Sequence, residues 1–300
     1  MSLLFPGTTL PTTVVGSYPV VQGKGLSGLL DPFRDAVRTA VTDQLAAGID
    51  IISDGQVRGD MVKIFTSRLP GVRGAEIIGK VSPPEGPITL GDTRYAISKA
   101  PRVKGIITGP ATLSFALHIS SPVYRDRNDL ALDLARALAQ EAHSLAAAGA
   151  AVIQIDEPIL STGTADLSVA REALKILTRG LRVPVCLHVC GDLTSVISEL
   201  IGMPVGILDF EFVKSPGNLA LCREMDFGRM MIGFGCVDSS DPVAETAAII
   251  RSRIETGLSV FAPEQLLIDP DCGLRMLPRD IAFKKISRMV EAVKEVRETL

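Results

Sequence analysis

The sequence contains no tryptophan, and aromatic residues make up only 4% of its 300 residues. It has little excess charge of either sign, because the formal net charge is −3 and no long basic run occurs. Nucleic-acid-binding surfaces depend on clustered lysine and arginine, so no nucleic-acid partner is expected. Every apolar run is shorter than the roughly 20 residues that a membrane-spanning helix needs, so no membrane partner is expected either.

A disulfide pattern and a secretory signal are also missing. The five cysteines are an odd number and lack the spacing of a disulfide framework. The N-terminal residues have no basic segment followed by an apolar one, as a secretory signal would. We therefore expect a cytoplasmic protein with reduced thiols. The cysteines are Cys186, Cys190, Cys222, Cys236 and Cys272.

Apolar residues, in contrast, make up 46% of the chain, which is enough for a sizeable core. Short apolar runs alternate with segments of helical spacing along the whole sequence. Eight buried strands, each followed by a helix or a long connection, predict an α/β fold of the (β/α)8 or TIM-barrel type, forming a single domain over residues 1–300. The predicted strands are 12–18, 49–53, 103–108, 151–155, 184–192, 205–212, 229–234 and 265–268, and the main predicted helices are 31–47, 129–148, 166–178, 192–201, 243–256 and 279–300.

Residues 71–100 interrupt this alternation. The segment is polar, and runs of β-forming residues flank a Pro-Pro-Glu-Gly-Pro sequence at 83–87. This pattern predicts a β-hairpin inserted after the second strand, where it would stand over the top face of the barrel.

A candidate metal site begins in the fifth predicted strand. His188 and Cys190 are two residues apart, so on a strand they point to the same side. That pair alone is more often part of an ordinary core, since cysteine is commonly buried. Active sites of barrels, however, lie at the C-terminal ends of the strands, here called the rim. Glu211 and Cys272 end the sixth and eighth predicted strands, so the four residues together predict a metal site at the rim.

The kinds of ligand select the metal and suggest a reaction. Two thiolates, an imidazole and a carboxylate suit Zn²⁺ better than Mg²⁺ or Ca²⁺, which prefer oxygen ligands. Glu211 is the natural ligand for an incoming thiol to displace. Zn²⁺ with two thiolates and a carboxylate carries a charge of −1, and a substrate thiolate in place of Glu211 preserves it. The bound sulfur would then stay electron-rich, as attack on a carbon electrophile requires.

Further polar residues end the other predicted strands. Ser17 ends the first, Gln56 follows the second, and Asp156 and Glu157 follow the fourth. Each also has a simple structural explanation, such as strand termination at Glu157. Their joint placement makes them candidate substrate-binding residues.

At these positions the sequence resembles the catalytic barrel of cobalamin-independent methionine synthase. The resemblance covers nearly the whole chain, and its most specific segments are 153–158 (Ile-Gln-Ile-Asp-Glu-Pro), 188–190 (His-Val-Cys) and 270–273 (Pro-Asp-Cys-Gly). It implies zinc ligation by the positions His188, Cys190, Glu211 and Cys272. It also implies that Asp156 holds the amino group of homocysteine and that Gly16 and Ser17 contact the carboxylate of homocysteine.

Departures from the family pattern concern the methyl donor and the substrate amine. The family's tryptophan that stacks on folate has no counterpart in residues 109–125. The family's histidine that protonates the leaving nitrogen is replaced by Ser240. Gln56 lies near the position of an acidic residue that helps to hold the substrate amine in the family. Cleavage of a carbon–nitrogen bond needs a general acid, whereas release of cob(I)alamin needs no proton. With these departures the chain resembles the short single-barrel relatives, and that resemblance implies a corrinoid methyl donor. We therefore expect methyl transfer from methylcobalamin, or from a methylated corrinoid protein as partner, to homocysteine, forming methionine.

Other interpretations stay open at this point. Folate-dependent methionine synthesis would retain the family's donor. A coenzyme M methyl- or alkyltransferase would use a similar zinc site, although coenzyme M has no ammonium group for Asp156 to hold. A barrel with a structural or sensory zinc ion would not be an enzyme, and no thiol would enter its metal site.

Overall fold

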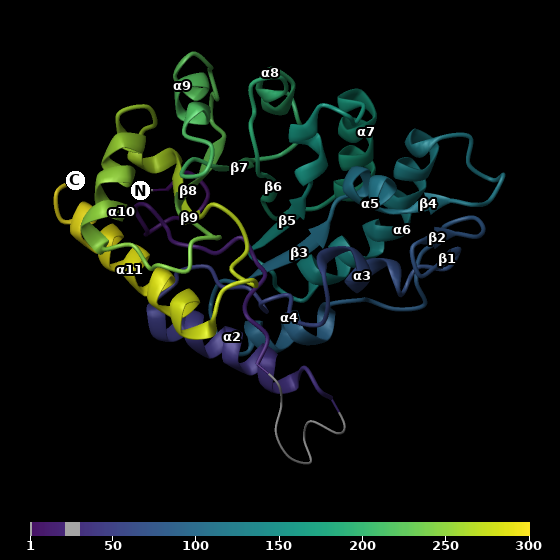
Figure 1. The fold of residues 1–300 in the computed structure, drawn as a ribbon, viewed down its shortest axis with the longest axis horizontal. Helices are drawn as coiled ribbons and strands as arrows, with labels where there is room; N and C mark the ends of the chain where they lie inside the picture. The colour runs from purple at the N-terminus through teal and green to yellow at the C-terminus, as the bar shows by residue number, and fades with distance from the viewer. Residues whose placement is uncertain (1, 22–30) are drawn as a thin grey trace.

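The structure is a computed structural model that describes residues 2–21 and 31–300 (Figure 1). Its centre is a sheet of six parallel strands in the order β3-β5-β6-β7-β8-β9. Every residue of these strands is buried, as expected where helices cover one face of a sheet and a filled barrel interior covers the other. The strands are β3 (Lys104–Thr108), β5 (Val152–Asp156), β6 (Val185–Val189), β7 (Ile207–Glu211), β8 (Met231–Val237) and β9 (Leu266–Pro270).

The N-terminal part of the chain closes this sheet into a barrel. Thr12 bridges to Ile268 in β9, Thr13 bridges to Ile51, and Ile52 bridges to Val103 beside β3, all in parallel. The first two predicted strands therefore lie between β9 and β3, paired only through single bridges. The prediction of a (β/α)8 barrel is confirmed.

Helices surround the strands (Figure 1). Side chains of Asp126 and Asp166 accept hydrogen bonds from the first backbone N–H groups of α6 and α7, so an N-cap begins each helix. The helix predicted at 192–201 is shorter in the structure, since only its last five residues are helical. The α-helices are α2 (Arg34–Ala47), α3 (Met61–Thr66), α4 (Leu90–Ile97), α5 (Pro110–Ala116), α6 (Arg127–Ala147), α7 (Leu167–Thr178), α8 (Ile197–Ile201), α9 (Gly217–Arg223), α10 (Ala247–Leu258) and α11 (Arg279–Arg297), and the 3-10 helices are η1 (Pro158–Thr162) and η2 (Pro263–Gln265).

The insertion at 71–100 contains a hairpin, but its turn is not at 83–87 as predicted. Two short antiparallel strands, β1 (Val72–Arg73) and β2 (Glu76–Ile77), pair on either side of Gly74 and Ala75, and β4 (His118–Ile119) extends the small sheet. The segment after Pro83 and Pro84 continues into α4. Proline has no N–H to donate to a ladder, so this stretch is a poor partner for a strand. Figure 1 shows the small sheet at the right of the view, beside α3 and α5.

Inside the barrel, period-two alternation of the strands stacks the side chains in layers. The layer nearest the N-terminal ends of the strands is apolar, and Phe5 packs against it. The next layer contains polar residues, including Gln154 and His188, two positions further along their strands. The apolar layer is formed by Ile51, Val152, Cys186, Ile207, Met231 and Leu267. Cys186 is buried in this layer, and Cys222 is buried in α9.

Membrane-spanning helices are absent from residues 2–21 and 31–300. Among their helices, none combines the length and the apolar character required to cross a bilayer.

Candidate active site

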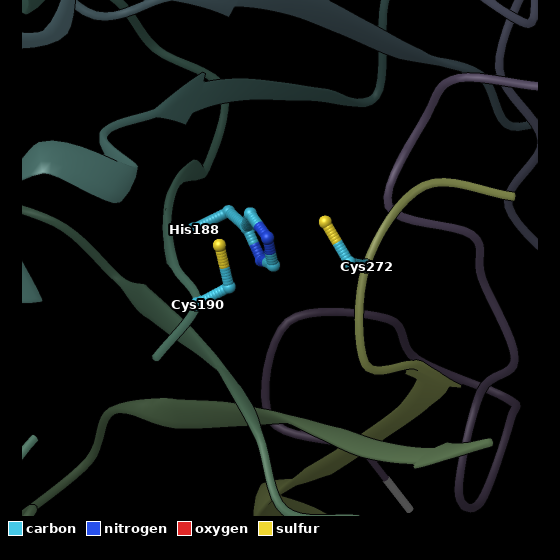
Figure 2. Close-up of side chains that lie close together, drawn as sticks. All are labelled: His188, Cys190 and Cys272. Atoms are coloured by element: carbon cyan, nitrogen blue, oxygen red, sulfur yellow. The ribbon is translucent and has the colours of Figure 1, made fainter. Parts of the chain in front are cut away.

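Three side chains predicted as metal ligands meet at the rim. The ligand atoms of His188, Cys190 and Cys272 all lie within 4.8 Å of one another. His188 is in β6, Cys190 follows that strand directly, and Cys272 lies in the loop after β9 (Figure 2). Residues more than 80 positions apart in the chain thus form one cluster, which we call the His/Cys/Cys triad.

The surroundings of the triad favour one thiolate even before a metal binds. The neighbouring thiol of Cys190 and imidazole of His188 lower the pKa of Cys272 below that of an ordinary thiol. The pKa of Cys190 is raised, because its thiol lies beside Cys272 and is partly buried. A negative charge is therefore stabilised at Cys272, as a metal ligand requires.

Glu211 ends β7 at the same rim but does not join the triad in the structure. Among the described residues, the metal-binding cluster contains only the triad. The Glu211 carboxylate is buried, and its Oε1 accepts a hydrogen bond of 2.6 Å from Oγ of Ser215. Metal ligation by Glu211 thus remains a prediction.

Asp156 is a buried carboxyl group at the end of β5, with 4% of its surface exposed. Burial raises its pKa to about 6, although the charge of His188 and a hydrogen bond from Gln154 oppose this shift. Nε2 of Gln154 donates to Asp156 at 2.7 Å, while Oε1 of Gln154 accepts from the buried Lys104 at 2.6 Å. Asp156 is the register partner of His188 in β5 and β6, so this carboxyl lies beside the triad.

Gly16, Ser17 and Gln56 lie together near the triad. Gly16 packs against the side-chain amide of Gln56, and Ser17 packs against Gly273, the residue after Cys272. Gln56 has a φ of 44°, a left-handed conformation that residues other than glycine rarely adopt. Its buried Nε2 has no hydrogen-bond partner in the described part of the chain. Strain and an unsatisfied donor are typical of a ligand-binding position.

Glu157 stabilises the beginning of the helix α5 at the rim. Its two carboxylate oxygens accept hydrogen bonds from the backbone N–H groups of Ala111 and Thr112, at 2.9 and 2.6 Å. These groups belong to the first turn of α5, where a negative charge is favourable. Burial raises the pKa of Glu157 to about 7. Contact between Glu157 and substrate remains a prediction, whereas its contacts with α5 position that helix at the rim.

Sequence reasoning missed two residues that connect the loops of the rim. Asp271 accepts hydrogen bonds from the N–H groups of residues 212, 213 and 214, which joins the loop of Cys272 to the loop after Glu211. Asn218 donates to the carbonyl oxygens of Gly191 and Glu211, which joins the loop after β6 to that after β7. Asp271 lies within the Pro-Asp-Cys-Gly segment, but nothing in that segment indicates its distant partners.

A cavity of about 920 Å³ opens beside the rim. It lies between the loop after the second strand and the helices α3 and α4, and its lining includes Asp54, Gln56, Lys63 and Ala116. Gln56 lines this cavity and also contacts Gly16, which lies near the triad. The side chain of Gln56 therefore lies between the cavity and the triad. The cavity has room for a substrate larger than an amino acid.

Comparison with known proteins identifies the family. Residues 10–295 match the family described as cobalamin-independent synthase, catalytic domain. The chain belongs to this family. Proteins named methionine synthase are similar over nearly their whole length: one from Methanothermobacter marburgensis is 46% identical, over 95% of this chain and 99% of that protein. One from Methanocaldococcus jannaschii is 43% identical, with the same coverage, and one from Saccharolobus solfataricus is 34% identical, over 97% and 96%.

Solved structures support the same fold. A B12-independent methionine synthase from Shewanella sp. W3-18-1, in complex with selenomethionine, has a TM-score of 0.87 at 23% identity, over 97% of this chain and 99% of that chain. A methyltransferase from Methanosarcina mazei has a TM-score of 0.70 at 15% identity, over 97% and 95%. At these identities the likeness establishes the barrel fold alone.

Family membership corrects the expected methyl donor. The cobalamin-independent synthase family does not take its methyl group from methylcobalamin, so the predictions of a methylcobalamin donor and of a corrinoid protein partner were wrong. Those predictions depended on the absent tryptophan and on Ser240 in place of a histidine. The absence of one acid does not exclude a nitrogen leaving group, because any acidic group or water that reaches the nitrogen can supply the proton.

Proposed function

We propose that this chain is a methionine synthase that transfers a methyl group to the sulfur of homocysteine at a zinc ion. The observation that carries this proposal is the His/Cys/Cys triad at the rim of a barrel of this family. Two thiols and an imidazole within 4.8 Å of one another are a donor set that suits zinc. Bound there, zinc would lower the pKa of the substrate thiol, so that the thiolate is present at neutral pH.

Glu211 and Ser215 complete the proposed metal site. Three ligands and an exchangeable fourth position are typical of catalytic zinc. Glu211 would occupy the fourth position at rest, and Ser215 would hold its carboxylate once homocysteine has replaced it. The hydrogen bond between Ser215 and Glu211 supports the second of these arrangements.

Homocysteine would be oriented by its two charged ends. The Asp156 carboxylate would bind the ammonium group, since it is buried beside the triad and already held by Gln154. Backbone groups of Gly16 and Ser17 would bind the carboxylate, and the free Nε2 of Gln56 would add a donor. The substrate sulfur would thereby be directed to the metal.

The proposed methyl donor is an N-methylated folate of the methyltetrahydrofolate type. Membership in a cobalamin-independent family supports this donor, and the cavity beside Gln56 supplies space for a bicyclic ring and its tail. Ala116, within the segment 109–125 that has no folate-stacking tryptophan, lines this cavity. The folate would be held there without an indole partner.

A methionine-formation assay tests the donor and the acceptor separately. Purified zinc-loaded protein is given homocysteine with either methyltetrahydrofolate or methylcobalamin, and methionine is measured. We expect methionine from methyltetrahydrofolate only, and none when coenzyme M replaces homocysteine. Methylation of coenzyme M, or turnover with methylcobalamin alone, would contradict the proposed substrates. A zinc site that takes up no thiol would contradict the enzymatic role itself.

A further inference from the structure

Two carboxyl groups in the barrel interior have no apparent structural purpose. Asp209 in β7 and Asp269 in β9 are both completely buried. None of their four carboxylate oxygens accepts a hydrogen bond within the described residues. Buried carboxyls are normally bonded or paired, because an unpaired buried charge costs several kcal/mol or more. The buried cation Lys104 does not offset this cost by a direct bond, since its Nζ donates to Gln154.

The contact that Asp209 does make is with the histidine of the triad. Oδ2 of Asp209 lies 3.3 Å from Nδ1 of His188. The two residues are paired in the register of β6 and β7, and His188 is 98% buried. Neither nitrogen of the imidazole has an aligned hydrogen bond within residues 2–21 and 31–300. A donor and an acceptor therefore face each other in a buried layer at the triad.

The neighbouring strand makes room for this carboxyl. Gly233 in β8 is the register partner of Asp209, and a Cβ built on Gly233 would lie only 2.6 Å from Cγ of Asp209. Any larger residue at 233 would displace the carboxyl from its place beside His188. Three adjacent strands thus supply an imidazole, a carboxylate and the space that the carboxylate occupies.

We propose that Asp209 is the positioning residue of the metal site, accepting the Nδ1 proton of His188 so that Nε2 is the metal-binding atom. Histidine ligands commonly donate their second N–H to a carboxylate, which fixes the tautomer and the ring orientation. Asp269 is a second buried carboxyl in the same layer, and burial together with the charge of Asp209 raises its pKa. The inference rests on the proposed metal site, but it concerns which atom binds the metal and makes no use of the methyl donor.

A merely structural role for Asp209 makes a different prediction. A carboxyl that held the fold together would be expected to accept hydrogen bonds, and its loss would destabilise the metal-free protein. A carboxyl retained for its effect on His188 is a cost to the fold, so its replacement should leave the metal-free protein equally stable or more stable. Under the proposal, replacement of Asp209 therefore lowers metal affinity without lowering the stability of the metal-free protein.

NMR spectroscopy of the loaded protein identifies the metal-binding nitrogen. The protein is prepared with nitrogen-labelled histidine and loaded with an NMR-active cadmium isotope in place of zinc. The chain has only three histidines, and His118 and His143 are exposed, so the signals of His188 can be assigned. We expect scalar coupling between cadmium and Nε2, and a slowly exchanging proton on Nδ1. Coupling to Nδ1 would overturn the proposal.

Substitutions test the role of Asp209 without reference to activity. Asp209→Leu removes the acceptor, and we expect zinc affinity, measured by competition with a chelator, to fall about 10- to 100-fold. Asp209→Asn retains an acceptor without the charge and should restore part of that affinity. Asp269→Asn is the matched control, since it removes a buried carboxyl from the same layer but leaves Asp209 beside His188, and it should cost less affinity than Asp209→Leu.

Thermal unfolding of the metal-free variants completes the test. The proposal that Asp209 positions His188 is supported if Asp209→Leu is as stable as the parent but binds zinc weakly. Unchanged zinc affinity in Asp209→Leu, or equal losses in Asp209→Leu and Asp269→Asn, would overturn it. If the parent protein loads metal as described but forms no methionine, the proposed function fails while this inference stands. If the parent binds no metal at the triad, both fail.

Discussion

At the scale of single residues, the thiols of the triad differ from the other cysteines by their surroundings. Cys186, Cys222 and Cys236 are fully buried, and desolvation raises the pKa of each, which keeps it a neutral thiol. Cys190 and Cys272 are partly accessible and contact His188. Reactivity toward a metal is therefore decided by position within the fold, because the chemistry of the five side chains is the same.

Replacement of a triad cysteine should release the metal. Cys272→Ser or Cys190→Ser leaves two of the three clustered ligands, and a hydroxyl is a poor substitute for a thiolate on zinc. We expect the folded variants to lose most of their zinc, measured by elemental analysis after gel filtration. Cys222→Ala is the control, since that thiol is buried in α9, and it should retain the metal. Full zinc in both serine variants would show that the site is misassigned.

Asp156 should select for the amino group of the thiol substrate. Loss of one partner of a largely desolvated ion pair costs on the order of 3–5 kcal/mol. Asp156→Asn should therefore weaken homocysteine binding, measured by calorimetry, much more than it weakens binding of a thiol without an amine. Since burial raises the pKa of Asp156 to about 6, homocysteine should also bind the parent protein more weakly as the pH falls below that value. Equal losses for both thiols would contradict the assignment.

At the scale of secondary-structure elements, the stability of the helix α5 depends on a residue that follows the strand β5. Glu157 follows β5 and accepts hydrogen bonds from two N–H groups of the first turn of α5. The helix has only seven residues, and its N-cap residue Gly109 has no side chain that could accept these bonds. The Glu-Pro sequence at 157–158 thus follows β5 directly, and its glutamate caps α5, which lies before α6 in the chain.

Removal of this cap should destabilise the fold. Glu157→Ala leaves the N–H groups of Ala111 and Thr112 buried without an acceptor, at a cost of about 1–3 kcal/mol for each such group. We expect the free energy of unfolding, from urea titration, to fall by at least the cost of one group. Glu172→Ala is a matched control, because Glu172 is an exposed glutamate of α7, and it should have little effect. A stable Glu157→Ala variant with impaired homocysteine binding would instead support the predicted substrate contact.

At the scale of the whole molecule, buried carboxyls with raised pKa values should govern the pH dependence of stability. Burial raises the pKa of Asp54 to about 6 and that of Asp271 to about 7. Near pH 5 the folded chain holds these protons while the unfolded chain has released them, so folding takes up protons. The free energy of unfolding of the metal-free protein should therefore fall by a few kcal/mol as the pH rises from about 4 to about 7.

Denaturant titrations across this pH range provide the measurement. Asp54→Asn removes one of the raised groups, and its stability should depend less steeply on pH than that of the parent. Stability of the metal-free parent that increases with pH over the same range would contradict the prediction.

The sequence by itself determined the barrel and the triad. Apolar runs of strand length gave all eight strand positions, because a barrel strand buried on both faces has few alternatives to aliphatic residues. Placement of polar residues at the ends of those runs was enough to locate the triad, since the ends of parallel strands meet at one rim. The position of Asp156 beside this cluster followed from the same rule.

Only the tertiary structure decided the partners of these residues. The hydrogen bonds of Glu157 to α5 and of Asp271 to residues 212–214 join segments 45 or more positions apart, and no local pattern encodes such distances. The hairpin turn at Gly74, in place of 83–87, follows from pairing with β4. In the sequence, Asp209 resembled an ordinary strand residue, and Asp269 came directly after a predicted strand. Closure of the barrel placed them inside it and set Asp209 against His188, because the register between strands depends on the whole sheet.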